Sequence, residues 1–278
     1  MIIIKSASYL SNFLAKHNSG KKIGFVPTMG ALHEGHISLI QRAKEDNDIT
    51  VCSIFINPAQ FNNHSDFIKY PITIEQDIEL LIAASCDLLF MPSLSEIYPE
   101  GYKKKYYSLG KIESLWEGHY RPGHFQGVCQ VVERLLEIVI PQRIYLGQKD
   151  YQQCMVIKKL IEILQKENQH EIVICPTIRE VNGLAMSSRN LRLTEGEKEK
   201  AAGIYNALVF LRHNINKTHE EIKCTAIDAL QANGFLVDYV AIADALTLEP
   251  PDTSFPKLIG MIAATINDVR LIDNMLLN

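Results

Sequence analysis

The residues best suited to chemistry are two histidines, His33 and His36, in the segment PTMGALHEGH at positions 27–36. A β-branched, apolar run precedes this segment, and a stretch with the helical spacing of apolar residues follows it, which predicts a strand, a turn and a helix. Histidines three residues apart at the start of a helix share one face. Backbone N–H groups at a helix start attract anions, and the two glycines of the segment let the backbone approach a ligand closely. This combination favours phosphoryl chemistry on a nucleotide.

Two other interpretations of the histidine pair stay open. The side chains can be ordinary surface residues beside a turn, or they can chelate a metal ion. The segment does not have the HExxH spacing of zinc proteases, and neither a cysteine nor a further histidine stands nearby at ligand spacing. A nucleotide is therefore the preferred ligand.

A second polar turn, Gly147-Gln148-Lys149-Asp150, follows the strand-like run RIYLG at 143–147. Lys149 is a point charge suited to phosphate oxygens, and Asp150 can cap the next helix or bind a ribose. Ligands of open α/β sheets bind beyond the carboxyl ends of the strands, so we expect this turn at the same edge of the sheet as the histidines. Taken alone, a lysine in a polar turn is more often a solvated residue. A role for Lys149 in binding phosphate therefore depends on the turn lying at the same edge of the sheet as the histidines.

A third polar segment, Met186-Ser187-Ser188-Arg189, lies in the stretch REVNGLAMSSRN. Small hydroxyl residues beside an arginine suit a flexible, cationic lid that closes on a triphosphate. An ordinary serine-rich linker is the alternative.

The elements that must position these segments alternate along the chain. Short β-branched runs and longer helical stretches follow one another up to Pro176, and several of the runs are apolar throughout, as in parallel strands covered on both faces. After Pro176 come a polar loop, two helical stretches and three strand-like runs. The sequence predicts an α/β fold: a Rossmann-like doubly wound parallel sheet at 1–176 and a smaller α+β lid domain at 177–278.

Composition narrows the class of protein. A chain of 278 residues with 47% hydrophobic and 22% charged residues is ordinary for a globular protein and long enough for two domains. A net charge of −4 has the wrong sign for coating nucleic acid, and no apolar run approaches the length of a membrane span. No signal peptide is recognised, so we expect a cytoplasmic protein. The cysteines are too far apart for CxxC pairs and are predicted to be buried free thiols: Cys52, Cys86, Cys129, Cys154, Cys175 and Cys224.

Five segments together resemble the pantothenate synthetase (pantoate–β-alanine ligase) family: PTMGALHEGH, INPAQF, RPGHFQGV, GQKDYQQ and LAMSSRNLRL. The match runs in order over nearly the whole chain. HxGH alone marks only the wider nucleotidylyltransferase superfamily, whereas the five segments jointly are highly specific.

The resemblance implies an ATP-dependent ligation of pantoate and β-alanine through pantoyl adenylate, with magnesium as cofactor and a homodimeric assembly. His36, His33 and Lys149 take the catalytic positions, and Gln60 and Gln153 resemble the glutamines that hold pantoate. Pro27, Met29, Val131 and Val132 resemble the apolar walls around pantoate. The implied ATP-binding residues are Met29, Gly30, Ala31, Leu32, His33, Glu34, Gly35 and His36, then Gly147, Gln148, Lys149 and Asp150, then Ile178 through its backbone, and Met186, Ser187, Ser188 and Arg189.

Three positions depart from the family pattern. Ile72 stands where the pattern YPRT has arginine, Leu146 where an aromatic residue precedes the lysine turn, and Asn182 where an aspartate precedes the glycine of the lid loop. None removes a charged group that the chemistry requires. His119 and His124, in EGHYRPGHFQG, are interpreted as residues of a turn-rich loop rather than metal ligands.

Two alternative functions use the same features. A nucleotidylyltransferase acting on a phosphate acceptor would share the HxGH segment, but the neutral amides of Gln60 and Gln153 suit hydroxyl and carboxylate groups better than phosphate. A nonenzymatic nucleotide sensor would keep the ATP site and lack the reaction. A synthetase for tRNA is disfavoured because acidic residues outnumber basic ones after residue 177.

Overall fold

The computed structural model describes residues 1–17, 20–251 and 257–278. The chain folds into two compact units. Unit 1 contains residues 1–109, 123–147 and 153–175, and unit 2 contains residues 110–122, 148–152 and 176–278. Unit 2 thus takes in two short segments that precede residue 176. The assignment of two domains with a boundary at that residue stays a prediction.

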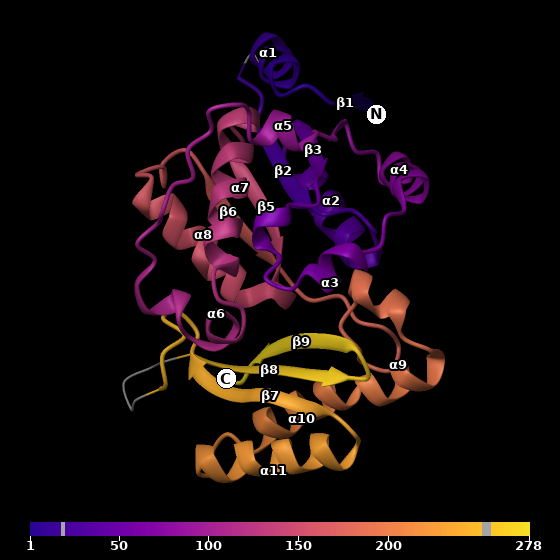
Figure 1. Cartoon of the computed structure of the whole chain (residues 1–278), viewed down its shortest axis with the longest axis vertical. Coiled ribbons are helices and arrows are strands. Elements are labelled where there is room, and N and C mark those ends of the chain that lie inside the picture. Colours follow the sequence, from indigo (N-terminus) through magenta and orange to yellow (C-terminus); the bar gives the residue numbers. More distant parts are fainter. Residues whose placement is uncertain (18–19, 252–256) are drawn as a thin grey trace. The chain divides into compact units, whose positions relative to one another are not determined.

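Unit 1 is built on a six-stranded parallel sheet with the order β1-β4-β3-β2-β5-β6. Figure 1 shows strands β2, β3, β5 and β6 of this sheet. The strands are β1 (Ile2–Ile4), β2 (Ile23–Thr28), β3 (Ile49–Ile54), β4 (Leu88–Phe90), β5 (Arg143–Gly147) and β6 (Glu171–Cys175). After β2, the strands β3 and β4 are added toward one edge of the sheet. After β5, the strand β6 is added toward the opposite edge. The direction of winding therefore reverses between β2 and β5, which is where open α/β sheets bind ligands.

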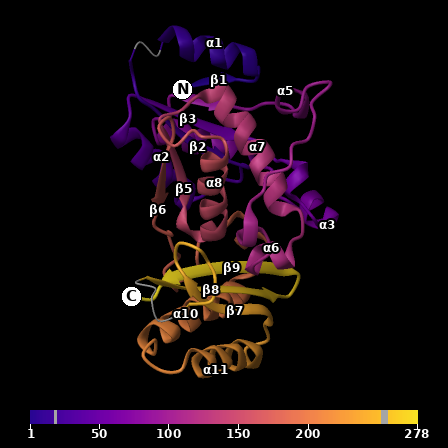
Figure 2. The same cartoon turned by 90° about the vertical axis from the view of Figure 1, so that its left-hand side faces the viewer.

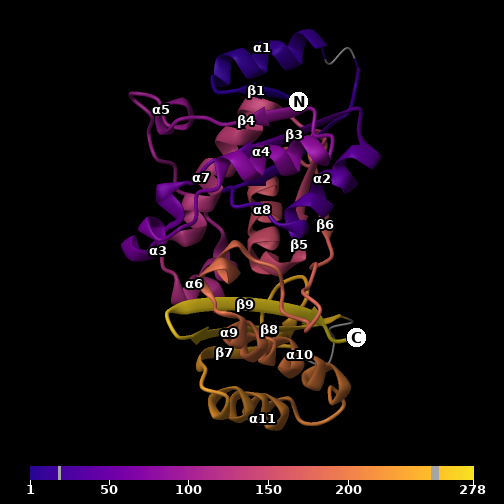
Figure 3. The same cartoon turned by 90° about the vertical axis from the view of Figure 1, so that its right-hand side faces the viewer.

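Helices cover both faces of this sheet. The helices are α1 (Ala7–His17), α2 (Glu34–Asp46), α3 (His64–Ile68), α4 (Ile74–Ala83), α5 (Leu94–Ile97), α7 (His124–Val139) and α8 (Tyr151–Ile163), with a 3-10 turn η1 (Pro58–Gln60). Figures 2 and 3 show α7 and α8 on one face and α2 and α4 on the other. Val26, Cys52 and Leu89, from three neighbouring strands, pack with α2 and α4 in one buried core. Because both faces are covered, β2 and β3 are apolar almost throughout.

Unit 2 contains a three-stranded antiparallel sheet, β7-β8-β9. Its strands are β7 (Leu236–Asp244), β8 (Leu258–Ile266) and β9 (Val269–Leu276), and its helices are α6 (Trp116–Tyr120), α9 (Glu195–Ala201), α10 (Gly203–His213) and α11 (His219–Ala232). Three 3-10 turns, η2 (Gly110–Glu113), η3 (Gln148–Asp150) and η4 (Ser188–Arg192), complete it. One face of the sheet buries its apolar residues against α10 and α11. The expected combination of a doubly wound parallel sheet and a smaller α+β part is confirmed.

Five of the six cysteines are buried and free, as expected, and Cys224 is the exception. It lies on α11, where Ile222 and Ala226 point into the core. Residues two positions apart on a helix face different directions, so Cys224 is exposed although Ile222 and Ala226 are buried. The expectation that all six thiols are buried was wrong for this one.

None of the helices in the described ranges combines the length and the apolar character that crossing a membrane requires.

Candidate functional site

The two segments that carry the candidate residues leave adjacent strands of the sheet. The segment with the histidines follows β2, and the turn η3 with Lys149 follows β5 directly in the chain. β2 and β5 are paired in parallel, with Gly24 opposite Arg143 and Phe25 opposite Ile144. Their carboxyl ends therefore lie side by side at the point where the winding reverses.

A buried aspartate shapes the turn after β2. Gly30 and Ala31 both adopt left-handed backbone angles, with φ of 80° and 50°. The Asp77 carboxylate accepts the backbone N–H groups of Ala31 at 2.9 Å and Leu32 at 2.8 Å, and the Thr73 hydroxyl at 3.0 Å. A Cβ atom on Gly30 would lie 3.0 Å from an Asp77 oxygen, so the turn also needs the small residue there.

Asp77 is a functional candidate that the sequence analysis missed. Its side chain is only 1% exposed and lies on the buried face of α4, one turn before Leu81. An acidic residue at an inward-facing position of an amphipathic helix was the signal that could have identified it.

The two histidines cap α2 reciprocally. His33 is the N-cap residue, and its Nδ1 atom accepts the Gly35 N–H at 3.1 Å. The His33 N–H in turn donates to His36 Nδ1 at 3.4 Å, and the two ring centroids lie 4.1 Å apart. Because each Nδ1 atom acts as an acceptor, the proton of each neutral ring must be on Nε2. In that form the ring N–H that could bond a phosphate oxygen is the one on Nε2.

Gln60 and Met29, both predicted site residues, contact each other. Gln60 is buried at the end of η1, and its Nε2 atom donates to the Met29 sulfur at 3.0 Å. Its Oε1 atom accepts from Asn57 Nδ2 at 3.2 Å, which orients the amide. Asn57 is itself held by the Gly127 carbonyl at 3.1 Å and by the Tyr98 hydroxyl at 3.0 Å.

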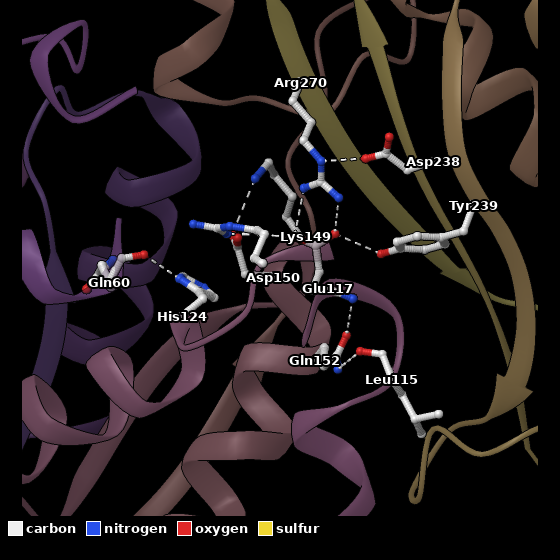
Figure 4. A network of polar contacts seen from close by, with 11 residues as sticks. Gln60, Leu115, Glu117, His124, Lys149, Asp150, Gln152, Asp238, Tyr239 and Arg270 are labelled. Atoms are coloured by element: carbon white, nitrogen blue, oxygen red, sulfur yellow. Dashed lines mark hydrogen bonds and ion pairs between the residues drawn. The ribbon is translucent and has the colours of Figure 1, made fainter. Parts of the chain in front are cut away.

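The start of α7 fixes the backbone of η1. His124 Nδ1 donates to the Gln60 carbonyl at 2.7 Å, a contact drawn in Figure 4. A Cβ atom on Gly127 would lie 2.2 Å from the Ala59 carbonyl oxygen, so only glycine permits this approach. His124, expected in a turn-rich loop, is the first residue of α7 and is buried.

The predicted apolar walls are buried or partly buried within unit 1. Val131 and Val132 are each 6% exposed on α7. Of the departures from the family pattern, Leu146 is buried in β5 at 6% exposure, whereas Ile72 is 70% exposed. The assignment of these walls to a substrate stays a prediction.

In unit 2, four charged residues form one cluster. Lys149 Nζ lies 3.3 Å from Asp150 Oδ2, and the lysine side chain is only 15% exposed. Desolvation opposes ionisation of Asp150, but Lys149, Arg189 and Arg121 outweigh it and lower the pKa of that carboxyl. The structure thus brings together Lys149, Asp150 and Arg189 and adds Arg121, from the RPGHF segment, which the sequence analysis did not single out.

A buried glutamate on α6, Glu117, pairs with Arg121. Figure 4 shows the contacts of this glutamate with Arg270 and Tyr239. Glu117 is 6% exposed and lies 3.7 Å from the Arg121 guanidinium. Arg270 donates to both carboxylate oxygens of Glu117, at 2.9 and 2.7 Å, and Tyr239 donates to one at 3.0 Å. Burial alone would raise the pKa of Glu117, yet these partners, Arg270 foremost, lower it. The carboxylate therefore stays charged.

The two glutamines after η3 differ in their surroundings. Gln152 is 4% exposed, accepts the Glu117 N–H at 3.0 Å and donates to the carbonyls of Ile112 and Leu115 at 2.9 and 2.8 Å. Its hydrogen bonds thus serve the fold of unit 2. Gln153, the predicted substrate residue, is partly exposed.

The segment before η4 folds back on itself. The Met186 N–H donates to the Ile178 carbonyl at 3.0 Å, so two residues predicted to bind ATP are adjacent. Ser187 caps η4, accepting the Arg189 N–H at 3.3 Å. Asn182, where the family pattern has aspartate, uses its amide group to donate to the Lys198 carbonyl at 3.3 Å. A carboxylate could not make that contact.

Across the described ranges, no group of three or more His, Cys, Asp or Glu side chains is arranged to hold a metal ion.

Comparison with known proteins decides the family. The family model described as pantoate-beta-alanine ligase matches residues 2–276. The chain belongs to the pantoate–β-alanine ligase family. The expectation of an enzyme of this ligase class is thereby confirmed.

Relatives and solved structures agree with the family. A pantothenate synthetase of Cytophaga hutchinsonii is 46% identical over 100% of this chain and 99% of its own length, and one of Thermodesulfovibrio yellowstonii is 45% identical over 92% of both. The crystal structure of the Thermus thermophilus synthetase is similar with a TM-score of 0.93 and 40% identity, covering 100% of this chain and 99% of that one. The Francisella tularensis ligase, complexed with beta-gamma ATP and β-alanine, has a TM-score of 0.84 and 39% identity over 100% of this chain and 98% of that one.

Proposed function

We propose that this ligase condenses pantoate with β-alanine to pantothenate, a precursor of coenzyme A, in two steps. The pantoate carboxylate attacks the α-phosphorus of ATP, forming pantoyl adenylate and releasing pyrophosphate. The amine of β-alanine then attacks the acyl carbon and displaces AMP. The observation that carries the proposal is the pairing of β2 with β5 at the reversal of winding, since the two candidate ATP segments leave the sheet there. The ATP compound and β-alanine bound to the Francisella tularensis relative support it.

The proposed ATP-binding residues act mainly by neutralising charge. We assign the phosphates to His33, His36 and Lys149, and we assign closure over them to the segment from Met186 to Arg189. Since Nδ1 of each histidine accepts a backbone N–H, the ring donor of each neutral imidazole is its Nε2–H. Donors aimed at the charge that develops on a departing pyrophosphate stabilise the transition state most. Ile178 is proposed to contact adenine through its backbone.

The first step needs no base from the protein. A carboxylic acid with a pKa of about 4 is already ionised at neutral pH, so pantoate arrives as the nucleophile. Gln60 and Gln153 are proposed to hold its hydroxyl and carboxylate groups, and Pro27, Met29, Val131 and Val132 to surround its methyl groups. The contact of Gln60 with the Met29 sulfur supports a joint role for these two residues.

Magnesium is proposed to arrive with ATP. The described residues provide no cage of three metal-ligating side chains, and magnesium commonly keeps phosphate and water ligands with few from the protein. Bound there, the ion would neutralise part of the phosphate charge. The residues of this chain then orient the phosphates around it.

A homodimer and a cytoplasmic location, both implied by the family resemblance, are proposed as well. Sedimentation velocity tests the first, and fractionation of cells tests the second. Nucleic acid and membranes are not proposed partners.

The decisive experiment is exchange of labelled pyrophosphate into ATP, with and without pantoate. With β-alanine omitted, the proposed reaction gives exchange only when pantoate is present. Exchange that requires a phosphate-containing acceptor instead would indicate a nucleotidylyltransferase. ATP binding without any exchange would indicate a nucleotide sensor.

A further inference from the structure

Strand β9 of unit 2 carries two adjacent, almost fully buried polar residues, Asp273 and Asn274, 4% and 3% exposed. Neither belongs to a segment assigned to a substrate. The Asn274 amide nitrogen donates to two successive backbone carbonyls, that of Gln148 at 2.8 Å and that of Lys149 at 2.9 Å. Its amide oxygen accepts from Gln148 Nε2 at 3.2 Å. Both donors and the acceptor of this side chain thus hold the turn η3.

Asp273 fixes the place of Asn274. One carboxylate oxygen accepts the backbone N–H of Asn274 at 2.8 Å. The carboxylate also pairs with the Arg179 guanidinium, through contacts of 2.5 and 3.1 Å. Arg179 is held in turn by the Gly183 carbonyl at 3.1 Å and lies 4.5 Å from the centre of the Tyr205 ring. Asn274 is therefore anchored to the body of unit 2 and not to η3 alone.

We propose that Asn274 is a positioning residue for adenylate formation, which holds the carbonyls of Gln148 and Lys149 so that the Lys149 ammonium is presented to the triphosphate. This inference rests on the proposed function of Lys149. Asn274 does not touch the substrate and acts through the backbone of η3.

The shortness of η3 explains why such an anchor matters. A turn of three residues has too few hydrogen bonds of its own to fix its direction, and the lysine side chain is long and flexible. The two donors of Asn274 fix the backbone from which that side chain extends. Without them the turn relaxes, and a displacement of about 1 Å at a reacting group costs on the order of 100-fold in rate.

The test compares the two half-reactions in Asn274→Asp, which keeps the shape of the side chain and removes both donors. Pantoate-dependent pyrophosphate exchange is expected to fall roughly 10- to 100-fold in kcat, with a smaller change in the KM for ATP. Reaction of synthetic pantoyl adenylate with β-alanine is expected to stay within about twofold of wild type, because no pyrophosphate leaves in that step. Equal losses in both half-reactions would show a merely structural role and overturn the proposal.

Asn274→Ser keeps the test valid if Asn274→Asp does not fold. The serine hydroxyl can donate to one carbonyl at most, so a loss confined to exchange is again expected, and unchanged exchange overturns the proposal. Asn233→Ala is the matched control, because it removes a donor to the Ala229 carbonyl, at 2.7 Å, on the far helix α11. Exchange by that variant is expected to equal wild type.

A double-mutant cycle separates this inference from the proposed function. In Lys149→Ala, adding Asn274→Ala is expected to lower exchange less than about twofold further, because the positioned group is already gone. If Lys149→Ala is impaired and Asn274→Ala lowers its exchange by the same factor as in the wild-type background, the inference about Asn274 is overturned. The proposed role of Lys149 then stands. Wild-type exchange by Lys149→Ala itself overturns the proposed role of Lys149, and this inference with it.

Discussion

Asp77 holds Ala31 in a left-handed conformation by accepting its backbone N–H at 2.9 Å. The same carboxylate accepts the next N–H, that of Leu32, at 2.8 Å. These two bonds fix the turn immediately before the histidines that cap α2. A residue on α4 thereby determines where the start of α2 lies.

Replacing Asp77 by asparagine is expected to weaken both folding and adenylate formation. The amide has one acceptor oxygen for the two N–H groups and the Thr73 hydroxyl, so a buried donor is left unpaired at a cost of about 1–3 kcal/mol. Urea unfolding measures the stability, and pantoate-dependent pyrophosphate exchange measures the activity of the folded fraction. Glu79→Gln, an exposed position on the same helix, is the control. Full exchange activity by folded Asp77→Asn would contradict the positioning role of this residue.

Each histidine has two roles that can be tested separately, capping α2 and the proposed donation to a phosphate. His33→Asn keeps a good N-cap acceptor, and His36→Gln keeps an acceptor at the third position of the capping box. Each variant is expected to stay within about 1 kcal/mol of wild-type stability. Exchange is nevertheless expected to fall about 100-fold or more in each, since the imidazole ring and its Nε2–H are lost. Retention of wild-type exchange would leave the histidines with capping alone.

Lys149→Ala is expected to fold normally and to lose adenylate formation by about 100-fold or more, roughly 3 kcal/mol of transition-state stabilisation. The ammonium group is proposed to neutralise charge that moves onto the departing pyrophosphate. Thermal unfolding checks the fold, and exchange checks the first step. The control is Lys159→Ala, which removes an ammonium group on α8 that is 45% exposed and lies 3.0 Å from Glu162. This variant is expected to show wild-type exchange. Near-normal turnover by Lys149→Ala would count against its assignment.

Local patterns in the sequence predicted the parts of the fold that depend on neighbours along the chain. The alternation of apolar runs and helical stretches indicated a doubly wound sheet, because strands covered on both faces are apolar throughout. Strand ends next to polar turns placed His36 and Lys149 after two strands that prove to be adjacent. Cys224 was misjudged because all six thiols were treated alike, and its place on the helix surface between Lys223 and Thr225 was not considered.

Contacts between residues far apart in the sequence could not be predicted from local patterns. Asp77 contacts Ala31 across 46 residues, Asn274 contacts Gln148 across 126, and Arg270 contacts Glu117 across 153. Asp77, Asn274 and Arg270 are ordinary polar residues within elements whose hydrophobic pattern is set by other positions. Only the tertiary structure, which decides what each buried polar group must bond to, identifies them as supports of the site.

The second half-reaction is expected to accelerate with pH. The amine of β-alanine is protonated at neutral pH and must lose its proton before it can attack the adenylate. The rate of pantothenate formation from synthetic pantoyl adenylate should therefore rise from about pH 6 to about pH 9, as the fraction of free amine grows. Exchange, which involves no β-alanine, provides the reference profile. A flat profile for the second step would show that another event limits it.

Acid is expected to destabilise the fold through His170. This residue is 3% exposed, and its Nδ1 atom donates to the Pro141 carbonyl at 2.6 Å. Protonation must then add a hydrogen to Nε2, which has no hydrogen-bond partner among the described residues. Desolvation is the main cause that lowers the pKa of His170 below its ordinary value. In the unfolded chain a histidine has a pKa of about 6.5, so below that pH the unfolded state binds more protons and stability falls.

Urea unfolding at several pH values tests this expectation. Between about pH 7.5 and about pH 5.5 the wild-type free energy of unfolding should decrease, and His170→Gln, which cannot titrate, should lose less over the same interval. His213→Gln, at an exposed position on α10, should follow the wild-type curve. Equal losses in wild type and His170→Gln would mean that other groups cause the acid sensitivity, because the buried imidazole is the only group that differs between the two chains.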